Sequence, residues 1–146
     1  MVAKNLILIG AGLIALYLFS KKESYHCFWE DVPICDFSSY NTLTRTITEL
    51  IKNVDTDEDV SDQWSPQISE VWAAWIPSGE TQGISIPVAI QSQIGVNQWV
   101  LEPFSFPVGA TFRHIAFMLA ISGIWQGQSA QATRGRTIFI DAPPAT

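Results

Sequence analysis

The residues best suited to chemistry are two histidines, His26 and His114, and two cysteines, Cys27 and Cys35. His26 with the two cysteines would supply three metal ligands, but their spacing matches no zinc class and a fourth ligand is missing. His114 follows Arg113 without a nucleophile or an orienting acid in a recognisable pattern, and the Gly-x-Ser-x-Gly turn of hydrolases does not occur. We therefore predict no catalytic residue, no metal and no cofactor.

Carboxylates are concentrated between residues 23 and 62, outside the apolar C-terminal half where burial would raise a pKa for acid catalysis. Among them, the run from Asp55 to Asp62 is similar to the opening of a calcium-binding loop. Its sixth position, which needs glycine, is Val60, and its twelfth, which needs glutamate, is Pro66. We interpret the run as a solvated acidic linker.

A glycine motif near the N-terminus imitates a dinucleotide-binding turn. Gly10, Gly12 and Ala15 have the spacing of the Gly-x-Gly-x-x-Ala fingerprint, and acids follow about 20 residues later. The helix of such a unit needs a polar face, which residues 13–19 lack, and no further strand–helix–strand repeats follow. We interpret the glycines as packing residues of an apolar segment.

That apolar segment is predicted to be a membrane anchor because it has no polar side. As a helix, residues 6–19 reach about 21 Å and residues 2–20 about 28 Å, against a hydrocarbon core of about 30 Å. Lys4, Lys21 and Lys22 flank the segment and would lie at the two interfaces. The anchor residues are Leu6, Ile7, Leu8, Ile9, Leu13, Ile14, Leu16, Tyr17, Leu18 and Phe19.

A cleaved signal peptide is the main alternative for this segment. No Ala-x-Ala site follows it, and Lys21 and Lys22 occupy the place where cleavage would occur, so we expect the anchor to be retained. Basic residues are slightly more numerous on its C-terminal side, which favours a cytoplasmic location for the rest of the chain. Cys27 and Cys35 would then be reduced thiols, although a disulfide between them is sterically possible.

The composition limits the remaining function classes. The 146-residue chain is 47% apolar and 15% charged, with a formal net charge of −6. Residues 1–22 hold three lysines and no acid, residues 23–62 ten acids and two basic residues, and residues 63–146 four acids and three arginines. No basic patch exists to neutralise phosphates, so nucleic acid is excluded as a partner. We divide the chain into an anchor at 1–22, an acidic connector at 23–66 and a β domain at 67–146.

Within the connector, an apolar stripe at helical spacing predicts one amphipathic helix over roughly 39–53. The stripe consists of Tyr40, Leu43, Ile47, Leu50, Ile51 and Val54. Alternating threonines in the same stretch favour a strand instead, because β-branched residues suit sheets. We prefer the helix.

From residue 67 onward, short apolar runs separated by Gly and Pro predict a small β-sandwich or barrel. Strands are expected within 68–76, 84–94, 98–106 and 136–141, and 126–136 is interpreted as a polar loop. Residues 112–125 are apolar on both faces and fit either a central strand or a core helix; we favour the strand. The predicted fold is thus a transmembrane helix followed by a small, mainly β domain.

Tryptophans are abundant in this sequence. Trp usually belongs to the core because it buries a large area, although on a β-sandwich it can also stack on sugars or fill a partner's pocket. A low-charge surface rich in Gln, Ser and Ala is also typical of a subunit interface. The candidate partner-binding residues are Trp72, Trp75, Trp99, Trp125, Arg134 and Arg136.

This organisation, with the segment from Lys4 to Lys21 and Lys22, resembles the minor single-span membrane proteins of tailless icosahedral bacteriophages that contain an internal lipid bilayer. The resemblance implies a non-enzymatic structural protein that tethers the virion membrane to the capsid. Its partners would be the lipid bilayer and capsid or other assembly proteins, in a multimeric context. It would lie in the virion membrane or the host cytoplasmic membrane, with the β domain facing the capsid.

Two other functions stay open. The chain would fit an anchored adhesin or carbohydrate-binding β-sandwich displayed outside the cell, which predicts a disulfide between Cys27 and Cys35 and exposed tryptophans. A pilin-like subunit is the third possibility, but the apolar segment is short for one and no processing site precedes it.

Overall fold

The computed structural model describes residues 25–141. The predicted anchor from Leu6 to Phe19, with its flanking lysines, lies outside these residues. Within the described range, no helix has the length and apolar character needed to cross a bilayer. Antiparallel strands make up most of this range, so the prediction of a mainly β domain is confirmed.

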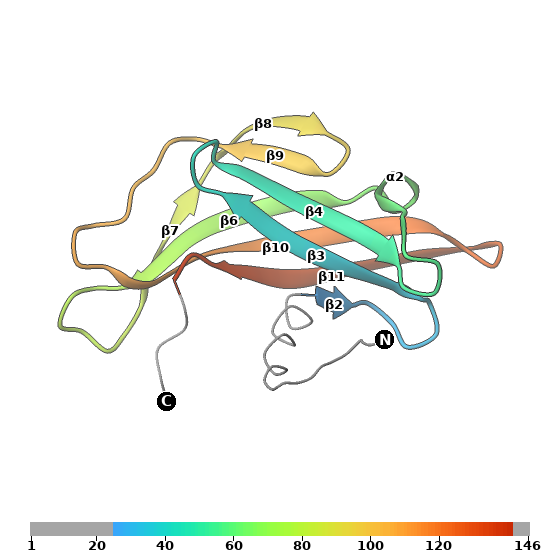
Figure 1. Cartoon of the computed structure of the whole chain (residues 1–146), viewed down its shortest axis with the longest axis horizontal. Coiled ribbons are helices and arrows are strands. Elements are labelled where there is room, and N and C mark those ends of the chain that lie inside the picture. Colours follow the sequence, from blue (N-terminus) through green and yellow to red (C-terminus); the bar gives the residue numbers. More distant parts are fainter. Residues whose placement is uncertain (1–24, 142–146) are drawn as a thin grey trace, which may run out of the picture.

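Two sheets form the fold (Figure 1). Sheet I has the order β11-β10-β6-β7, and sheet II has the order β2-β3-β4-β9-β8, with the short β5 also paired to β4. The strands of sheet I are β6 (Gln67–Ile76), β7 (Ile84–Val88), β10 (Thr111–Trp125) and β11 (Gln128–Phe139). Those of sheet II are β2 (Tyr25–Cys27), β3 (Ile34–Asn41), β4 (Thr46–Asn53), β5 (Glu58–Asp59), β8 (Ile90–Gly95) and β9 (Gln98–Leu101). One short helix, α2 (Ser61–Trp64), leads from β5 to β6.

The strand order of the two sheets matches that of a known class of β-sandwich. The chain changes sheets after β5, after β7 and after β9. If β3, β4, β6, β7, β8, β9, β10 and β11 are lettered A, B, C, C′, D, E, F and G, the sheets read A-B-E-D and G-F-C-C′. This is the strand order of immunoglobulin-like sandwiches. The predicted sandwich is therefore confirmed, with a topology that the sequence did not specify.

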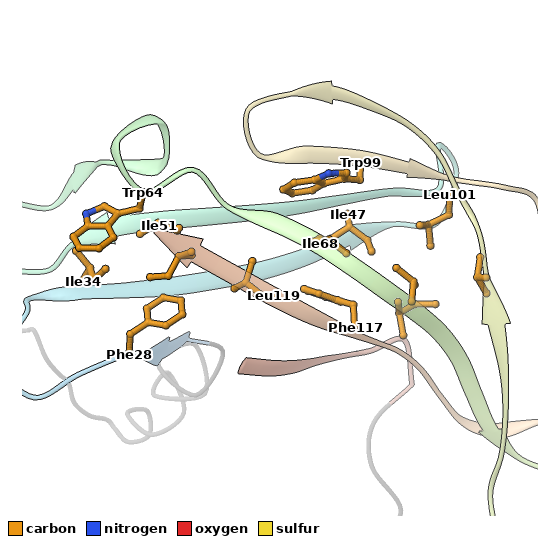
Figure 2. Packing of buried hydrophobic residues seen from close by; sticks show 14 of the residues in the cluster. Phe28, Ile34, Ile47, Ile51, Trp64, Ile68, Trp99, Leu101, Phe117 and Leu119 are labelled. Carbon is orange, nitrogen blue, oxygen red and sulfur yellow. The ribbon is translucent and has the colours of Figure 1, made fainter. Parts of the chain in front are cut away.

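Strand β10 shows why the two sheets pack together. Its alternate residues Ile115, Phe117, Leu119 and Ile121 are at most 2% exposed. Burying a side chain of this kind contributes about 1.5–3 kcal/mol, so the alternation holds one face of β10 against sheet II. The strand predicted over 112–125 is thus confirmed. The same buried cluster includes, from sheet II, Ile47, Ile51, Trp99 and Leu101 (Figure 2).

The helix predicted over roughly 39–53 is wrong. Strand β3 continues to Asn41, and β4 begins at Thr46. In the turn between them, Asn41 Oδ1 accepts hydrogen bonds from the backbone N–H groups of Leu43 and Thr44. Such an Asx turn competes with helix formation, and the β-branched residues of β4 favour a sheet. The strand that the alternating threonines indicated is the correct alternative.

The segment predicted as an acidic connector, residues 23–66, supplies β2 to β5 and α2. Its strand β4 pairs with β9, so that Ile47 lies opposite Trp99 across the predicted boundary. The acids between β4 and β5 lie in an exposed turn, where Lys52 Nζ is 2.6 Å from Asp57 Oδ1. Residues 25–141 therefore contribute to one sandwich, with the acidic run at its surface.

The polar segment 126–136, predicted as a loop, is mostly strand. Strand β11 pairs with β10 from Gln128, opposite Trp125, to Phe139. The reversal is confined to Gln126 and Gly127, whose φ angles of 52° and 78° are those of a type I′ hairpin turn. The prediction failed because the core-facing positions of β11 hold the small residues Ala130 and Ala132 and the charged residue Arg136, so its alternation is not a strongly apolar one.

A buried ion pair joins β11, an edge strand of sheet I, to β3 of sheet II. Arg136 of β11 donates hydrogen bonds from Nε and Nη2 to the two carboxylate oxygens of Asp36 in β3, both at 2.7 Å. Asp36 is 0% exposed and Arg136 8% exposed. Removing one partner of such a pair leaves the other charge buried and unpaired, at a cost of about 3–5 kcal/mol. The pair therefore fixes β11 beside β3.

Glu49 of β4 is buried on the same side of sheet II. Ser38 Oγ donates a hydrogen bond of 2.5 Å to Glu49 Oε1, while Oε2 makes no hydrogen bond to another described residue. Burial raises the pKa of Glu49 to about 10, and the neighbouring Asp36 adds to the rise. Glu49 is therefore a neutral carboxylic acid at pH 7, and its proton is available for a hydrogen bond to the neighbouring Asp36 carboxylate.

We expect Glu49→Gln to stabilise the protein at neutral and alkaline pH. In the unfolded chain Glu49 ionises near pH 4.5, whereas in the folded chain it keeps its proton to about pH 10. The folded state with its raised pKa therefore loses stability as the pH rises through this window, by up to about 1.4 kcal/mol per pH unit. Glutamine has the same shape and does not titrate, so the variant escapes this loss.

Urea unfolding between about pH 6 and pH 9 measures the effect. Glu102→Gln, at an exposed position, is the matched control and should follow the native protein. An unchanged pH dependence in Glu49→Gln would contradict the assignment of a buried neutral acid.

Candidate functional site

The surface of sheet I that points away from the core carries few charged side chains. Because Ile115, Phe117 and Leu119 point into the core, the residues between them point outward. The registers place Trp72 opposite Ala116, and the neighbouring strands continue these rows. We call this surface the outer face; it comprises Ser69, Trp72, Ala74, Ser85, Pro87, His114, Ala116, Met118, Ala120, Thr133, Gly135, Thr137 and Phe139. It contains no Asp, Lys or Arg, and its one charged residue is Glu70, which is exposed beside Ser69 where the pairing of β6 with β10 is irregular.

An aromatic cluster lies at one end of the outer face. The ring centroids of Phe112, His114 and Phe139 are 4.9–5.7 Å apart, and Phe139 is 47% exposed. Charges begin at the border of this cluster, where Arg113 and Asp141 form a bidentate ion pair with distances of 2.7 and 2.8 Å. The hydrogen bonds from Arg113 hold the pKa of Asp141 below its ordinary value. The paired charges therefore neutralise each other beside an apolar surface.

A hollow adjoins the outer face next to Trp72. It has a volume of about 520 Å³ and is lined mainly by apolar side chains of β6, β7 and the start of β8, among them Val71, Trp72 and Ile90. Its one acidic residue, Glu70, has a φ of 52° at an irregularity in the pairing of β6 with β10. This hollow could receive an apolar side chain of a protein bound to the outer face.

A second candidate site lies at the other end of β10, around the turn of the β10–β11 hairpin. Two adjoining hollows, of about 600 and 410 Å³, share Trp29, Asp31, Val32 and Trp125. We call them together the tryptophan cleft. The larger hollow is completed by Gln126, Gln128, Ser129, Ala130 and Gln131, and the smaller by Cys27, Glu30, Pro33, Cys35, Val54 and Asp55.

Packing beneath the cleft positions Trp29. Its ring centroid lies 5.8 Å from that of Trp64, which is 4% exposed and comes from α2. The Trp64 ring covers Gly123 of β10, so closely that a Cβ there would lie 2.7 Å from a ring carbon. Gly123 therefore makes room for Trp64, and Trp64 supports Trp29.

A disulfide closes the segment that carries Trp29. Cys27 and Cys35, which pair directly in the ladder of β2 and β3, are bonded to each other. The expectation of reduced thiols is therefore wrong for this structure. The cross-link joins the two ends of the segment that lines the cleft, so residues 28–34 have few alternative conformations.

The structure separates the six residues predicted to bind a partner. Trp72 lies on the outer face and Trp125 in the tryptophan cleft. Trp75 and Trp99 are 7% and 2% exposed and belong to the interior.

The two arginines also differ. Arg136 is held by Asp36, whereas Arg134 is exposed and donates a hydrogen bond to the carbonyl oxygen of Phe28 at 3.3 Å. Sequence reasoning missed Trp29 and the glutamines of the cleft. The dense aromatic and acidic residues around Trp29 were the available signal.

Comparisons with protein-family models, with curated proteins and with solved structures found no match for this chain. Within residues 25–141, no group of His, Cys, Asp and Glu side chains is placed to hold a metal ion. The two surfaces described above must therefore be interpreted from their own chemistry.

We expect Gly123→Ala to displace Trp64 and to lower the free energy of unfolding by about 1–3 kcal/mol, as overpacking in a core does. The added methyl group would meet the indole and, at 2.9 Å, the carbonyl oxygen of Gln63. The near-ultraviolet circular dichroism of the tryptophans and the urea midpoint measure the change. Gly95→Ala is the control, because the nearest atom to its new Cβ is the Gln98 side-chain oxygen at 4.0 Å. Equal effects of the two substitutions would contradict the packing described.

Proposed function

We propose that this chain is a non-enzymatic membrane-anchored docking protein that links a lipid bilayer to a protein shell. In this proposal the apolar segment from Leu6 to Phe19 enters the bilayer. The sandwich then binds a protein of the shell, such as a capsid, through the outer face. The observation that carries the proposal is the scarcity of charged side chains across this four-stranded surface, on which Glu70 is the one charged residue.

The chemistry of the outer face supports protein binding. Charged residues are depleted at the centre of protein interfaces, where aromatic residues and Met are enriched. In a chain with a net charge of −6, the outer face has one charged side chain, Glu70, and presents Trp72, Met118 and Phe139. The hollow beside Trp72 offers a place for one anchoring side chain of the partner, which is how a small number of residues provide most of an interface's affinity.

We expect Met118→Arg to abolish docking and to leave membrane attachment intact. Met118 lies in the middle of the outer face, between Ser69 and Gly135, so a guanidinium there would add bulk and lose its hydration in the complex. The measurement is the amount of protein that co-purifies with shell proteins after the bilayer is dissolved in detergent, which should fall by about tenfold or more.

The matched control is Gln93→Arg, an exposed position on β8 of the other sheet. It should co-purify with the shell as the native chain does. If Met118→Arg also co-purified normally, the outer face would not be the docking surface.

A second function has its own supporting observation. The disulfide between Cys27 and Cys35 is typical of proteins in oxidising compartments, and the tryptophan cleft has aromatic walls. Both favour an anchored carbohydrate-binding domain displayed outside the cell.

Thiol labelling of intact native material separates the two locations. A sandwich on the oxidising side of the membrane should show blocked cysteines that react with maleimide only after reduction. Free thiols at Cys27 and Cys35 in freshly isolated, alkylated material would contradict the display of the sandwich outside the cell. Because the chain has two cysteines, the mass added by the label reports their state directly.

A further inference from the structure

We propose that the tryptophan cleft binds a neutral oligosaccharide. The inference rests on the second function above and assigns it a site, a ligand class and the residues that select the ligand.

The shape of the cleft favours an extended ligand. Its two hollows share Trp29 and Trp125, so these indoles line both parts. Each hollow falls within the size range of small-molecule sites, which is about 300–1,000 Å³. A ligand with several linked rings would occupy both hollows and contact each indole.

The polar groups match a ligand with many hydroxyl groups. In the larger hollow, Gln126, Gln128 and Gln131 offer amides that both donate and accept hydrogen bonds. Asp31 is shared with the smaller hollow and accepts hydrogen bonds. Apolar faces of sugar rings can lie against the indoles while their hydroxyl groups reach these side chains.

The charged residues that line the cleft favour a neutral ligand. The smaller hollow adds Glu30 and Asp55, and neither lining includes Lys or Arg. Acidic sugars, phosphates and sulfated chains would therefore be repelled. A cationic ligand would find carboxylates beside an indole, but only in the smaller hollow and at Asp31. The uncharged amides of the larger hollow favour a neutral ligand over a cationic one.

The cleft is also held in shape before a ligand arrives. The disulfide constrains the segment that carries Trp29, and Trp64 packs under that tryptophan. The opposite wall of the cleft belongs to the β10–β11 hairpin, whose turn consists of two residues. A preformed site avoids the entropic cost of ordering loops on binding.

The test uses the full chain in a polyoxyethylene detergent, because a glucoside or maltoside detergent would itself supply a sugar. Chitotetraose, cellotetraose and maltotetraose are titrated separately while tryptophan fluorescence is recorded. We expect saturable binding of at least one of the three sugars. Gln128→Ala with Gln131→Ala, both at exposed positions, should weaken this binding by about tenfold or more without disturbing the fold. Trp125→Phe, which keeps the packing of the ring, should weaken it to a smaller extent.

Trp72→Ala, on the outer face, is the matched control and should bind the sugar like the native chain. No binding of any of the three sugars at millimolar concentration would overturn the proposal, as would tighter binding of heparin or of oligolysine. Met118→Arg separates this inference from the docking proposal. If that variant fails to dock yet binds the sugar, the outer face and the tryptophan cleft are separate binding surfaces, as proposed. If docking persists while the cleft variants lose the sugar, only the docking surface is wrong.

Discussion

The contact between β11 of sheet I and β3 of sheet II depends on the ion pair between Arg136 and Asp36. Two carboxyl groups, Asp36 and Glu49, and one guanidinium are buried together where the sheets meet. With Glu49 protonated the group is electrically neutral, whereas ionised Glu49 would leave an uncompensated negative charge in the core. The raised pKa of Glu49 is therefore the condition under which this polar cluster can be buried.

The same cluster connects the interior to the tryptophan cleft. The Arg136 guanidinium lies 5.1 Å from the centroid of the Phe28 ring, and Arg134 donates to the carbonyl oxygen of Phe28. Phe28 directly precedes Trp29, so two arginines of β11 hold the backbone and the ring next to the cleft's first indole. A polar strand that the sequence presented as a loop thus positions a candidate binding residue.

The sequence contained enough information for the sandwich but not for its surfaces. Strand β10 was predictable because its apolar alternation has a period of two, which burial on one face requires. Residues 39–53 were mistaken for a helix because their apolar residues fit both the helical period of 3.6 and the strand period of two. The turn made by Asn41 was not taken into account.

Long-range contacts account for the other errors. Strand β11 was missed because small residues and an arginine occupy its core-facing positions, and the partner that allows Arg136 to be buried, Asp36, is one hundred residues away in sequence. For the same reason no local pattern distinguished Trp75 and Trp99, which are interior, from Trp29, Trp72 and Trp125, which reach the surface.

The buried acid has a thermodynamic consequence for any study of this protein by heating. Near neutral pH the folded chain carries a proton on Glu49 that the unfolded chain releases to the solvent. The buffer takes up that proton, and its own heat of protonation enters the measured enthalpy. Calorimetric enthalpies of unfolding should therefore differ between phosphate and Tris at the same pH and melting temperature. Only after subtracting the buffer's contribution do they describe the protein itself.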